Sequence, residues 1–436
     1  MVAFAGTNSM LEPKHKAACG CDEQQTITGL LSVDEAADLA NSLVCPVRET
    51  ETVDLQTAIG RVLARDIHAP NPMPFFDNSA MDGYAVRTRD LEGSGPWRIA
   101  VAGTVAAGDA NCASSNADRI ALRIFTGAPV PGGFDAVVIQ ERCRMDGVEI
   151  AIPDRPRKGQ NIRYSGSDIV RGAVIAAAGT VIDPRHVGLL AANGYASASV
   201  FRRVRIGVLS TGDELTTGEI GRGPSQIFDA NRPMLIALAK MVGAAVTDLG
   251  IVPDDREGSI DLIRSIRDRF DLVISSGGVS VGGRDYLKSA LEQAGGAIVG
   301  WRVAVKPGKP VMFGRLGAAV FMGLPGNPLA AFVAFHLFVR PQIASLSGSA
   351  RGPAPPHPAI ARFDWRRKPG RAEYFPVRLA GHDSHGAPLV ERMGNGGSAA
   401  LCPLSTADGL GVVSALTELV SEGDLIAWHP FCTGFA

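Results

Sequence analysis

The sequence predicts a multidomain α/β protein with a central parallel-sheet α/β domain and two mainly β domains. The first observation is length, because 436 residues exceed one ordinary domain. The second is that apolar runs alternate with helical patterns between residues 201 and 346, as in a parallel sheet covered by helices. The third is that residues 70–168 and 359–436 carry short strand-like runs separated by turn residues. Together these observations indicate one α/β domain and two smaller β domains.

The composition predicts a cytoplasmic protein. Hydrophobic residues make up 46% of the chain and its formal net charge is −1, so it has no general attraction for nucleic acid or acidic membranes. No stretch approaches the roughly 18 uninterrupted apolar residues of a membrane span, and the N-terminus lacks the order of a signal peptide. The seven cysteines are an odd number that fits reduced thiols. We therefore expect neither nucleic acid nor a membrane as a partner.

The chain begins with a tail, residues 1–27, that shows no apolar period. Its Cys19 and Cys21 are interpreted as incidental thiols, because no second pair follows at zinc-finger spacing. The first helix is predicted in LLSVDEAADLANSLV, where Ser32 is a suitable N-cap before an apolar stripe at helical spacing. From residue 70 to residue 168, strands such as RIAVAG and DAVVIQERCRM are expected between Gly-Asp, Pro-Gly-Gly and Asp-Gly turns.

The α/β segment, residues 201–346, comes next along the chain. The predicted strands of this segment are VRIGVLS, AAVTDLGIV, FDLVISS, WRVAV and AAVFMG. Helices are predicted after Pro233, from Glu257 to Arg269, in SALEQAG and after Pro328. Residues 347–358 are rich in Pro and Gly and mark a linker. The remaining residues, 359–436, contain alternating segments such as EYFPVRL and predict a C-terminal β domain.

Four loops rich in Gly, Pro or polar residues follow predicted strands of the α/β segment. They are STGDEL (210–215), SSGGVS (275–280), KPGKP (306–310) and GLPGNP (323–328). Because ligands bind beyond the carboxyl ends of parallel strands, we expect all four to open onto one edge of the sheet. Glycine lets backbone N–H groups point at one anion, and Lys306 and Lys309 add positive charge. Asp213, Glu214 and Asp285 would repel a phosphate unless a divalent cation lay between, so the pattern predicts a phosphorylated ligand with Mg²⁺.

Any one of these loops alone is more often a tight turn, and the prediction depends on the joint pattern. Neither a Walker loop nor a dinucleotide-binding glycine motif occurs in this segment. A second polar stretch, PMPFFDNSAMDGYAVR (72–87), places Asp77, Asn78, Ser79 and Asp82 between aromatic residues. Its residues fit either a capped turn with buried aromatics or part of a site.

The motifs resemble those of the molybdopterin molybdenumtransferases, the family that includes the C-terminal E domain of gephyrin. The matching segments are FDNSAMDGYAVR, FTGAPVPGGFDAVV, LSTGDEL, SSGGVSVGGRDY, KPGKP and GLPGNP, in the usual order, and the likeness covers roughly residues 28–436. The resemblance implies a homodimer of four-domain subunits with shared active sites. Its domains would be a discontinuous helical linker domain (28–69 and 169–200), the β domain (70–168), a molybdopterin-binding α/β domain (201–346) and, after the linker 347–358, the C-terminal β domain (359–436).

The same resemblance implies an activity and a set of site residues. Adenylated molybdopterin is cleaved, molybdate is inserted at the dithiolene and AMP is released, with Mg²⁺. Catalytic roles would fall to Asp285, Glu214, Asp77, Lys306 and Thr126, with Asp77, Thr126, Arg163 and Asp168 supplied by the partner subunit. The implied metal ligands are Asp285, Glu214, Asp254 and Asp168, with Asp255 as an alternative to Asp254. Implied ligand-binding residues are Ser276, Gly277, Gly278, Ser280, Lys306, Lys309, Pro325, Pro328, Arg163, Arg302, Arg371 and Ser398.

The chain departs from the family pattern at several positions. Gly283 stands where an acidic residue is common, Ser167 replaces the usual Glu of a GED triplet, and GGSAAL lacks the second Gly of the usual GSG. Arg302 occupies what is often a lysine. The first two changes remove negative charge near the cleft, so they bear on metal affinity more than on fold or reaction.

The reaction needs no nucleophilic side chain, because molybdate oxygen, or water positioned by a carboxylate, can attack the phosphoanhydride. Transient contacts with the molybdopterin adenylyltransferase and with molybdoenzyme-maturation proteins are also expected. Two alternatives stay open at this point. One is ATP-dependent adenylylation of molybdopterin, against which the extra β domains argue. The other is a non-enzymatic scaffold, against which the carboxylates and lysines on one rim argue.

Overall fold

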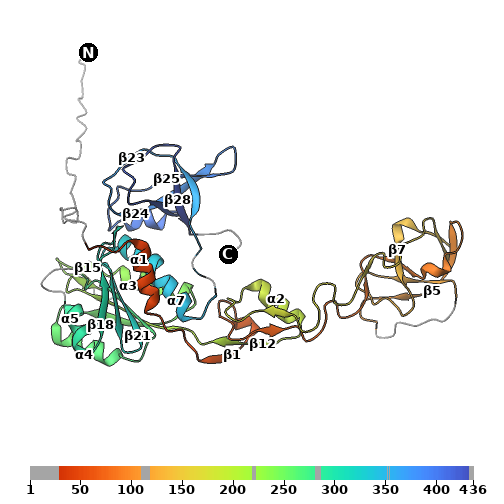
Figure 1. Cartoon of the computed structure of the whole chain (residues 1–436), viewed down its shortest axis with the longest axis horizontal. Coiled ribbons are helices and arrows are strands. Elements are labelled where there is room, and N and C mark those ends of the chain that lie inside the picture. The colour runs from red at the N-terminus through yellow and green to blue at the C-terminus, as the bar shows by residue number, and fades with distance from the viewer. Residues whose placement is uncertain are drawn as a thin grey trace, which may run out of the picture. The chain divides into compact units, whose positions relative to one another are not determined.

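The computed structural model describes residues 29–109, 118–218, 222–279, 286–350, 352 and 354–431. The chain forms two compact units. Unit 1 comprises Met1–Glu49 and Arg202–Ala436, and unit 2 comprises Thr50–Phe201. Figure 1 shows the elements of both units along the chain.

A six-stranded mixed sheet forms the centre of unit 1. Its order is β16 (Ala245–Val252), β13 (Arg205–Thr211), β17 (Leu272–Ser276), β21 (Ala319–Leu324), β20 (Met312–Leu316) and β18 (Ala297–Trp301). The first four strands are parallel, as predicted. β20 pairs antiparallel with both β21 and β18, so β20 alone runs against the other five strands, and a tight turn at Gly317 joins it to β21 as a hairpin. The prediction of WRVAV as a strand is wrong in its bounds, because Arg302 has a φ of 73° and β18 ends at Trp301.

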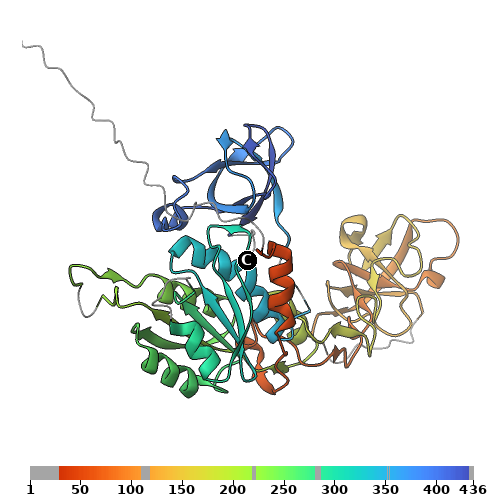
Figure 2. The same ribbon diagram turned by 60° about the vertical axis from the view of Figure 1, so that its left-hand side comes forward.

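Helices cover both faces of this sheet (Figure 2). Alternating side chains of β17 show the two faces, because Leu272 and Ile274 belong to one core and Val273 to the other. The first core includes α1 (Val33–Ser42), α3 (Asn231–Met241), α6 (Pro328–Ala334), the π-helical segment η5 (Phe335–Val339) and α7 (Arg340–Leu346). The second includes α4 (Arg256–Ile266) and α5 (Tyr286–Gln293). The predicted first helix is confirmed with a capping box between Ser32 and Glu35.

The helical run Pro328–Leu346 is long and apolar enough to cross a membrane by length and composition. Its mean hydropathy is 1.5, and 67% of the window is buried inside the protein. Its side chains pack against the first core of the sheet. A mostly buried apolar helix is typical of a protein core.

The C-terminal part of unit 1 is a β domain, as predicted. Its strands are β22 (His357–Ala361), β24 (Ala372–His382), β25 (Pro388–Arg392), β26 (Gly409–Val413) and β28 (Leu425–Pro430), with a short pair β23 (Trp365–Arg366) and β27 (Leu419–Val420) and a helix α8 (Leu401–Ser405). The order β24-β25-β22-β28-β26 closes on itself through β24 and β26. A further strand, β19 (Val305–Lys306), comes from the α/β segment and pairs in parallel with β24.

Unit 2 contains the first β domain and a second, smaller core. The β domain has the sheet order β7 (Ala136–Ile139), β4 (Gly83–Val86), β6 (Ile120–Ile124), β5 (Trp97–Val105), β9 (Glu149–Ile152) and β8 (Arg144–Asp146). The smaller core lies around α2 (Pro184–Ala192), with β1 (Thr50–Asp54) paired to β12 (Ser197–Phe201) and β2 (Ile67–His68) paired to β11 (Val174–Ala176). Residues 50–69 and 174–201 therefore fold together, whereas α1 packs in unit 1.

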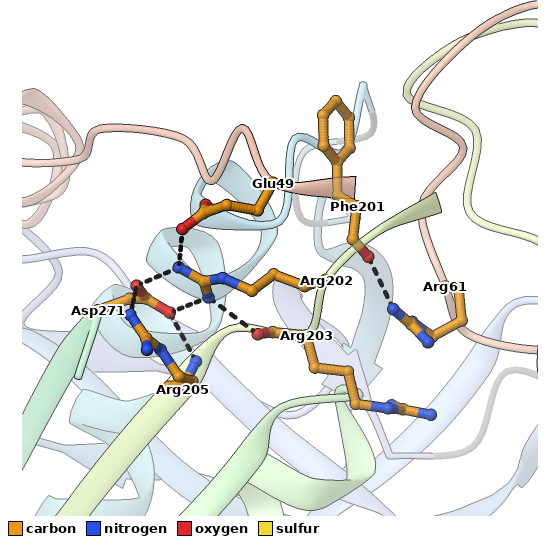
Figure 3. Close-up of polar contacts among 7 residues, drawn as sticks. All are labelled: Glu49, Arg61, Phe201, Arg202, Arg203, Arg205 and Asp271. Atoms are coloured by element: carbon orange, nitrogen blue, oxygen red, sulfur yellow. Dashed lines mark hydrogen bonds and ion pairs between the residues drawn. The ribbon is translucent and has the colours of Figure 1, made fainter. Parts of the chain in front are cut away.

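The partly buried carboxylate of Asp271, with 13% of its side chain exposed, organises the start of β13, at the point where the chain enters unit 1. Arg202 donates two hydrogen bonds to Asp271, of 2.7 and 2.9 Å, and lies 3.3 Å from Glu49 (Figure 3). The Arg205 N–H donates a third bond to Asp271, of 2.7 Å. Burial alone would raise the pKa of Asp271, but the hydrogen bonds and charges of Arg202 and Arg205 outweigh it and lower that pKa. In unit 2, Arg61 donates to the Phe201 carbonyl at 2.8 Å.

Asp271→Asn tests this arrangement. We expect the free energy of unfolding to fall by about 1–3 kcal/mol at pH 7, because a buried, charged acceptor of hydrogen bonds is lost. A carboxylate whose folded pKa is lowered stabilises the protein above its unfolded pKa of about 3.9, and this contribution disappears as the pH falls through the folded value. The difference in free energy of unfolding between wild type and Asp271→Asn should therefore shrink below about pH 4.

Calorimetric melting of the full chain at several pH values measures this effect. Asp261→Asn is the matched control, because Asp261 lies 3.8 Å from Arg264 with its side chain 80% exposed. We expect this control to change stability by less than about 0.5 kcal/mol. Equal effects of the two substitutions would contradict a stabilising role of Asp271.

Candidate active site

Three strands of the central sheet end in register. Ser210 of β13 pairs with Ser276 of β17, which pairs with Leu324 of β21. The loops that follow these strands begin at residues 212, 277 and 325 and therefore leave the sheet at one edge, as predicted. All three pairing residues are buried. The edge is thus a rigid floor from which three loops project.

The fourth loop, KPGKP, reaches this edge by another route. It does not continue β18, which ends at Trp301, but follows β19, which is bonded to the C-terminal domain. A Cβ atom on Gly308 would lie 3.5 Å from Pro325 Cγ and 3.4 Å from Ala330 Cβ. KPGKP and GLPGNP are therefore neighbours, although the predicted connection between strand and loop is wrong.

Glycine is required where these loops meet. Gly277 has a φ of 84°, and a Cβ there would lie 2.9 Å from both the carbonyl and hydroxyl oxygens of Thr211. Gly278 has a φ of 70°, and its Cβ would lie 2.8 Å from Leu287. On its other side, Gly277 approaches Gly326, whose added Cβ would be 3.9 Å from the Gly277 Cα. Side chains are absent because three stretches of backbone pass within van der Waals distance.

Asn231 ties these loops together, and the sequence analysis missed it. Its side-chain N–H groups donate to Ser276 Oγ at 2.8 Å and to the Gly326 carbonyl at 2.7 Å. The side chain is buried, and its Oδ1 has no hydrogen-bond partner within the described part of the chain. Nearby, Asp229 accepts a bond from Ser210 Oγ at 3.2 Å. The available signal was the polar segment FDANRP before an otherwise apolar helix.

Carboxylates line the β13 side of the edge. The Asp254 N–H donates to Asp213 Oδ1 at 3.0 Å, which brings the STGDEL and VPDDR loops together. Glu214 is exposed beside them and Asp254 is half-buried. Asp255 instead caps α4 by accepting from the Gly258 N–H at 2.7 Å, so its carboxylate is turned toward the first turn of that helix. Asp254 is therefore the better candidate of the two.

The described residues contain no group of three or more His, Cys, Asp and Glu side chains placed to hold a metal ion. Mg²⁺ is commonly held by one or two carboxylates together with substrate phosphates and water. Asp213, Glu214 and Asp254 supply hard oxygen donors of the type it prefers. In donor chemistry these residues fit a magnesium ion that is completed by the ligand.

Basic residues lie on the β21 side of the edge, away from the carboxylates of the β13 side. Lys306 Nζ is 3.3 Å from Glu373 of β24, and its side chain is 36% exposed. Asn327 donates to Ser398 Oγ at 2.8 Å, and the Leu329 N–H donates to the Ser398 carbonyl at 3.1 Å, so the last domain contributes Ser398 to this region. Among the other predicted ligand-binding residues of unit 1, Arg302, Lys309, Pro328 and Arg371 are half-buried and Pro325 is buried. Arg302 lies 5.6 Å from the Trp301 ring centre with a φ of 73°.

In unit 2, the remaining predicted residues gather on one surface. β3 (Asn78–Ser79) pairs with β10 (Ile162–Arg163), which places Arg163 opposite the residue after Asp77. Asp77 accepts a bond from the Ser165 N–H at 2.8 Å. Asp168 is linked to the same segment, because its N–H donates to the Met73 carbonyl at 3.1 Å.

Thr126 is held by Asp82, a residue of the same polar stretch that was not predicted to belong to the site. The Thr126 N–H and hydroxyl both donate to Asp82 Oδ1 at 2.7 Å, and these bonds lower the pKa of Asp82. Phe75 and Phe76 are 53% and 48% exposed. The interpretation of this stretch as a capped turn with buried aromatics is therefore wrong.

Some predicted residues lie outside the described part of the chain. These are Ser280, Gly283 and Asp285 in the loop after β17, and Cys19 and Cys21 in the N-terminal tail. Their proposed roles remain predictions.

Three segments of the chain match known protein families. Residues 31–194 match the MoeA N-terminal region (domain I and II). Residues 207–345 match a probable molybdopterin binding domain, and residues 358–431 match the MoeA C-terminal region (domain IV). The four loops described above lie within the second match.

Individual relatives cover most of the chain. A molybdopterin molybdenumtransferase of Haemophilus influenzae is 41% identical over 351 residues, which are 79% of this chain and 85% of the relative. Molybdopterin molybdenumtransferase 2 of Mycobacterium tuberculosis is 35% identical over 390 residues, which are 86% of this chain and 94% of the relative. A crystal structure of the molybdopterin biosynthesis moeA protein from Pyrococcus horikoshii OT3 has a TM-score of 0.78 at 26% identity, covering 92% of this chain and 100% of that chain.

The alignments with the two relatives extend over most of each chain, and the solved structure has the same fold as this chain. The motifs that resembled this family lie in the loops that follow strands of unit 1 and in residues 76–87 and 125–138 of unit 2. The chain belongs to the molybdopterin molybdenumtransferase family.

Proposed function

We propose that this protein inserts molybdate into adenylated molybdopterin and releases AMP. The observation that carries the proposal is the convergence of glycine loops, basic side chains and carboxylates at one sheet edge. The names of the relatives agree with such a transferase. The site residues predicted from the family motifs are proposed to act as stated above, including those of the loop that contains Ser280 and Asp285.

The two sides of the edge suit two parts of one ligand. Backbone N–H groups of the Gly277 and Gly326 loops can hold phosphate oxygens without moving, because their positions are fixed by packing. Lys306 and Lys309 bring positive charge from the other side. Mg²⁺ held near Asp213, Glu214 and Asp254 would offset the repulsion between molybdate and the adenylate phosphate.

Two substrate anions held at one edge can react without a nucleophilic side chain. The protein positions the phosphoanhydride, and its carboxylates can orient an attacking oxygen and accept a proton. AMP is the leaving group. We therefore expect no covalent intermediate with the protein.

We also propose that the protein works as a homodimer with shared sites in the cytoplasm. Asp77, Thr126, Arg163 and Asp168 would serve the sheet edge of the other subunit. The exposed Phe75 and Phe76 support this proposal, because aromatic residues near polar site residues are common at subunit contacts. Adenylated molybdopterin would arrive from a molybdopterin adenylyltransferase, and the product would pass to molybdoenzyme-maturation proteins.

The direct test is to incubate the full chain with adenylated molybdopterin and follow AMP by chromatography. We expect AMP only when molybdate and Mg²⁺ are both present, because two anions must be brought together across a cation. Omission of each component in turn is the control. Equal AMP release without molybdate would contradict the insertion reaction.

Lys306→Ala tests the basic side of the edge. We expect binding of adenylated molybdopterin to weaken by about tenfold or more, because a charged partner of phosphate is lost. Binding of phosphate-free pterin should change by less than about twofold. Titration calorimetry with both ligands measures the difference, and Lys240→Ala, an exposed lysine at the far end of α3, is the control. Equal losses for both ligands would point to a collapsed loop.

Mixed dimers test the shared site. Asp77→Ala and Asp285→Ala chains should each form inactive homodimers. In a mixed dimer one site collects both substitutions and the other collects none, so random pairing should restore roughly a quarter of wild-type activity. Mass spectrometry confirms that chains have exchanged, and AMP release measures activity. Full exchange without recovery would rule out sites built from two chains.

A further inference from the structure

Glu373 lies at the junction between the C-terminal domain and the KPGKP loop. It belongs to β24, and its carboxylate side chain is only 5% exposed. One oxygen, Oε1, is 3.3 Å from Lys306 Nζ, and the other, Oε2, accepts a bond of 3.1 Å from Arg367 Nε. A buried carboxylate is costly unless it is paired on both oxygens, and here each oxygen has its own cation.

Arg367 is itself held in place. Its side chain is 2% exposed, and it donates to the Ser414 carbonyl at 2.9 Å and to the carbonyls of Thr417 and Arg371. Because the guanidinium is planar and four of its five N–H donors are used, the position of the Glu373 carboxylate is fixed in turn. The same arginine thus holds the backbone of Arg371, a second residue predicted to bind the ligand.

The backbone aligns Lys306 with this carboxylate. Lys306 pairs directly with Glu373 where β19 joins β24, and the Ala372 N–H donates to the Ala304 carbonyl at 2.9 Å. Lys306 keeps 36% of its side chain exposed, and an ammonium group has three N–H donors, of which the contact with Glu373 uses only part. Two cations face one carboxylate, which leaves a net positive charge beside the loops.

We propose that Glu373 is a positioning residue, which aims the Lys306 ammonium group at the phosphate-bearing ligand and so makes the C-terminal domain part of the binding site. The proposal rests on the proposed function for the identity of the ligand. Glu373 does not touch the ligand and acts through Lys306. Its effect should therefore disappear when Lys306 is absent.

The first test needs no ligand. The rate at which an amine-reactive ester acylates Lys306 is followed by peptide mass spectrometry in wild type and Glu373→Gln. We expect acylation in the variant to be about threefold faster or more, because the ammonium loses the carboxylate that covers and orders it. Glu418→Gln is the matched control, since Glu418 is an exposed partner of Arg366 in the same domain. Unchanged acylation of Lys306 in Glu373→Gln would overturn the proposal.

The second test is a double-mutant cycle with adenylated molybdopterin. Glu373→Gln should raise KM about tenfold and change kcat less than about threefold in the wild-type background. In the Lys306→Ala background the same substitution should raise KM by less than about twofold. An equal effect in both backgrounds, or tighter binding by Glu373→Gln, would overturn the proposal.

Folding is monitored by melting of each variant, because Arg367 loses its charged partner in Glu373→Gln. If that variant does not fold, Glu373→Asp replaces it: the charge for Arg367 is kept while the carboxylate is withdrawn from Lys306. Acylation of Lys306 should then be faster than in wild type, and an unchanged rate would overturn the proposal. If wild type releases no AMP, the proposed function fails, whereas the acylation rates still decide whether Glu373 positions Lys306.

Discussion

The close approach of backbone to backbone at the carboxyl edge of the central sheet is the constraint on which the site depends. Ser210, Ser276 and Leu324 end three strands in register, so the following loops must pass each other within a few ångströms. Side chains at Gly277 would collide with Thr211. Glycine is therefore a packing requirement at this edge before it is a feature of ligand binding.

The C-terminal domain contacts the loops at this edge directly. β19 leaves the α/β segment to join β24, and Ser398 is bonded to the loop that precedes α6. The KPGKP loop is thus held between two domains of unit 1, and Lys306 owes its direction to Glu373. Such a connection gives a physical reason why the last domain contributes to a site whose floor belongs to another sheet.

The site residues of unit 2 are fixed mainly by backbone hydrogen bonds. Asp77 and Asp82 both use their carboxylates to hold neighbouring segments, through Ser165 and Thr126. An oxygen that already accepts such a bond is oriented but retains further acceptor capacity. Exposed aromatic side chains, Phe75 and Phe76, lie next to these carboxylates in the sequence.

The sequence by itself determined the family, the four loops and the alternation of helices and strands, because glycine spacing and apolar period are local properties of the chain. It did not reveal that β20 lies between β21 and β18 and runs against both, because a short apolar run carries no direction. Only the tertiary structure identified Asn231, Glu373 and Asp82 as the links between loops. The partners through which they make these links, Ser276, Gly326, Lys306 and Thr126, lie between 44 and 95 positions away, and contacts of that separation are decided by how strands and domains pack.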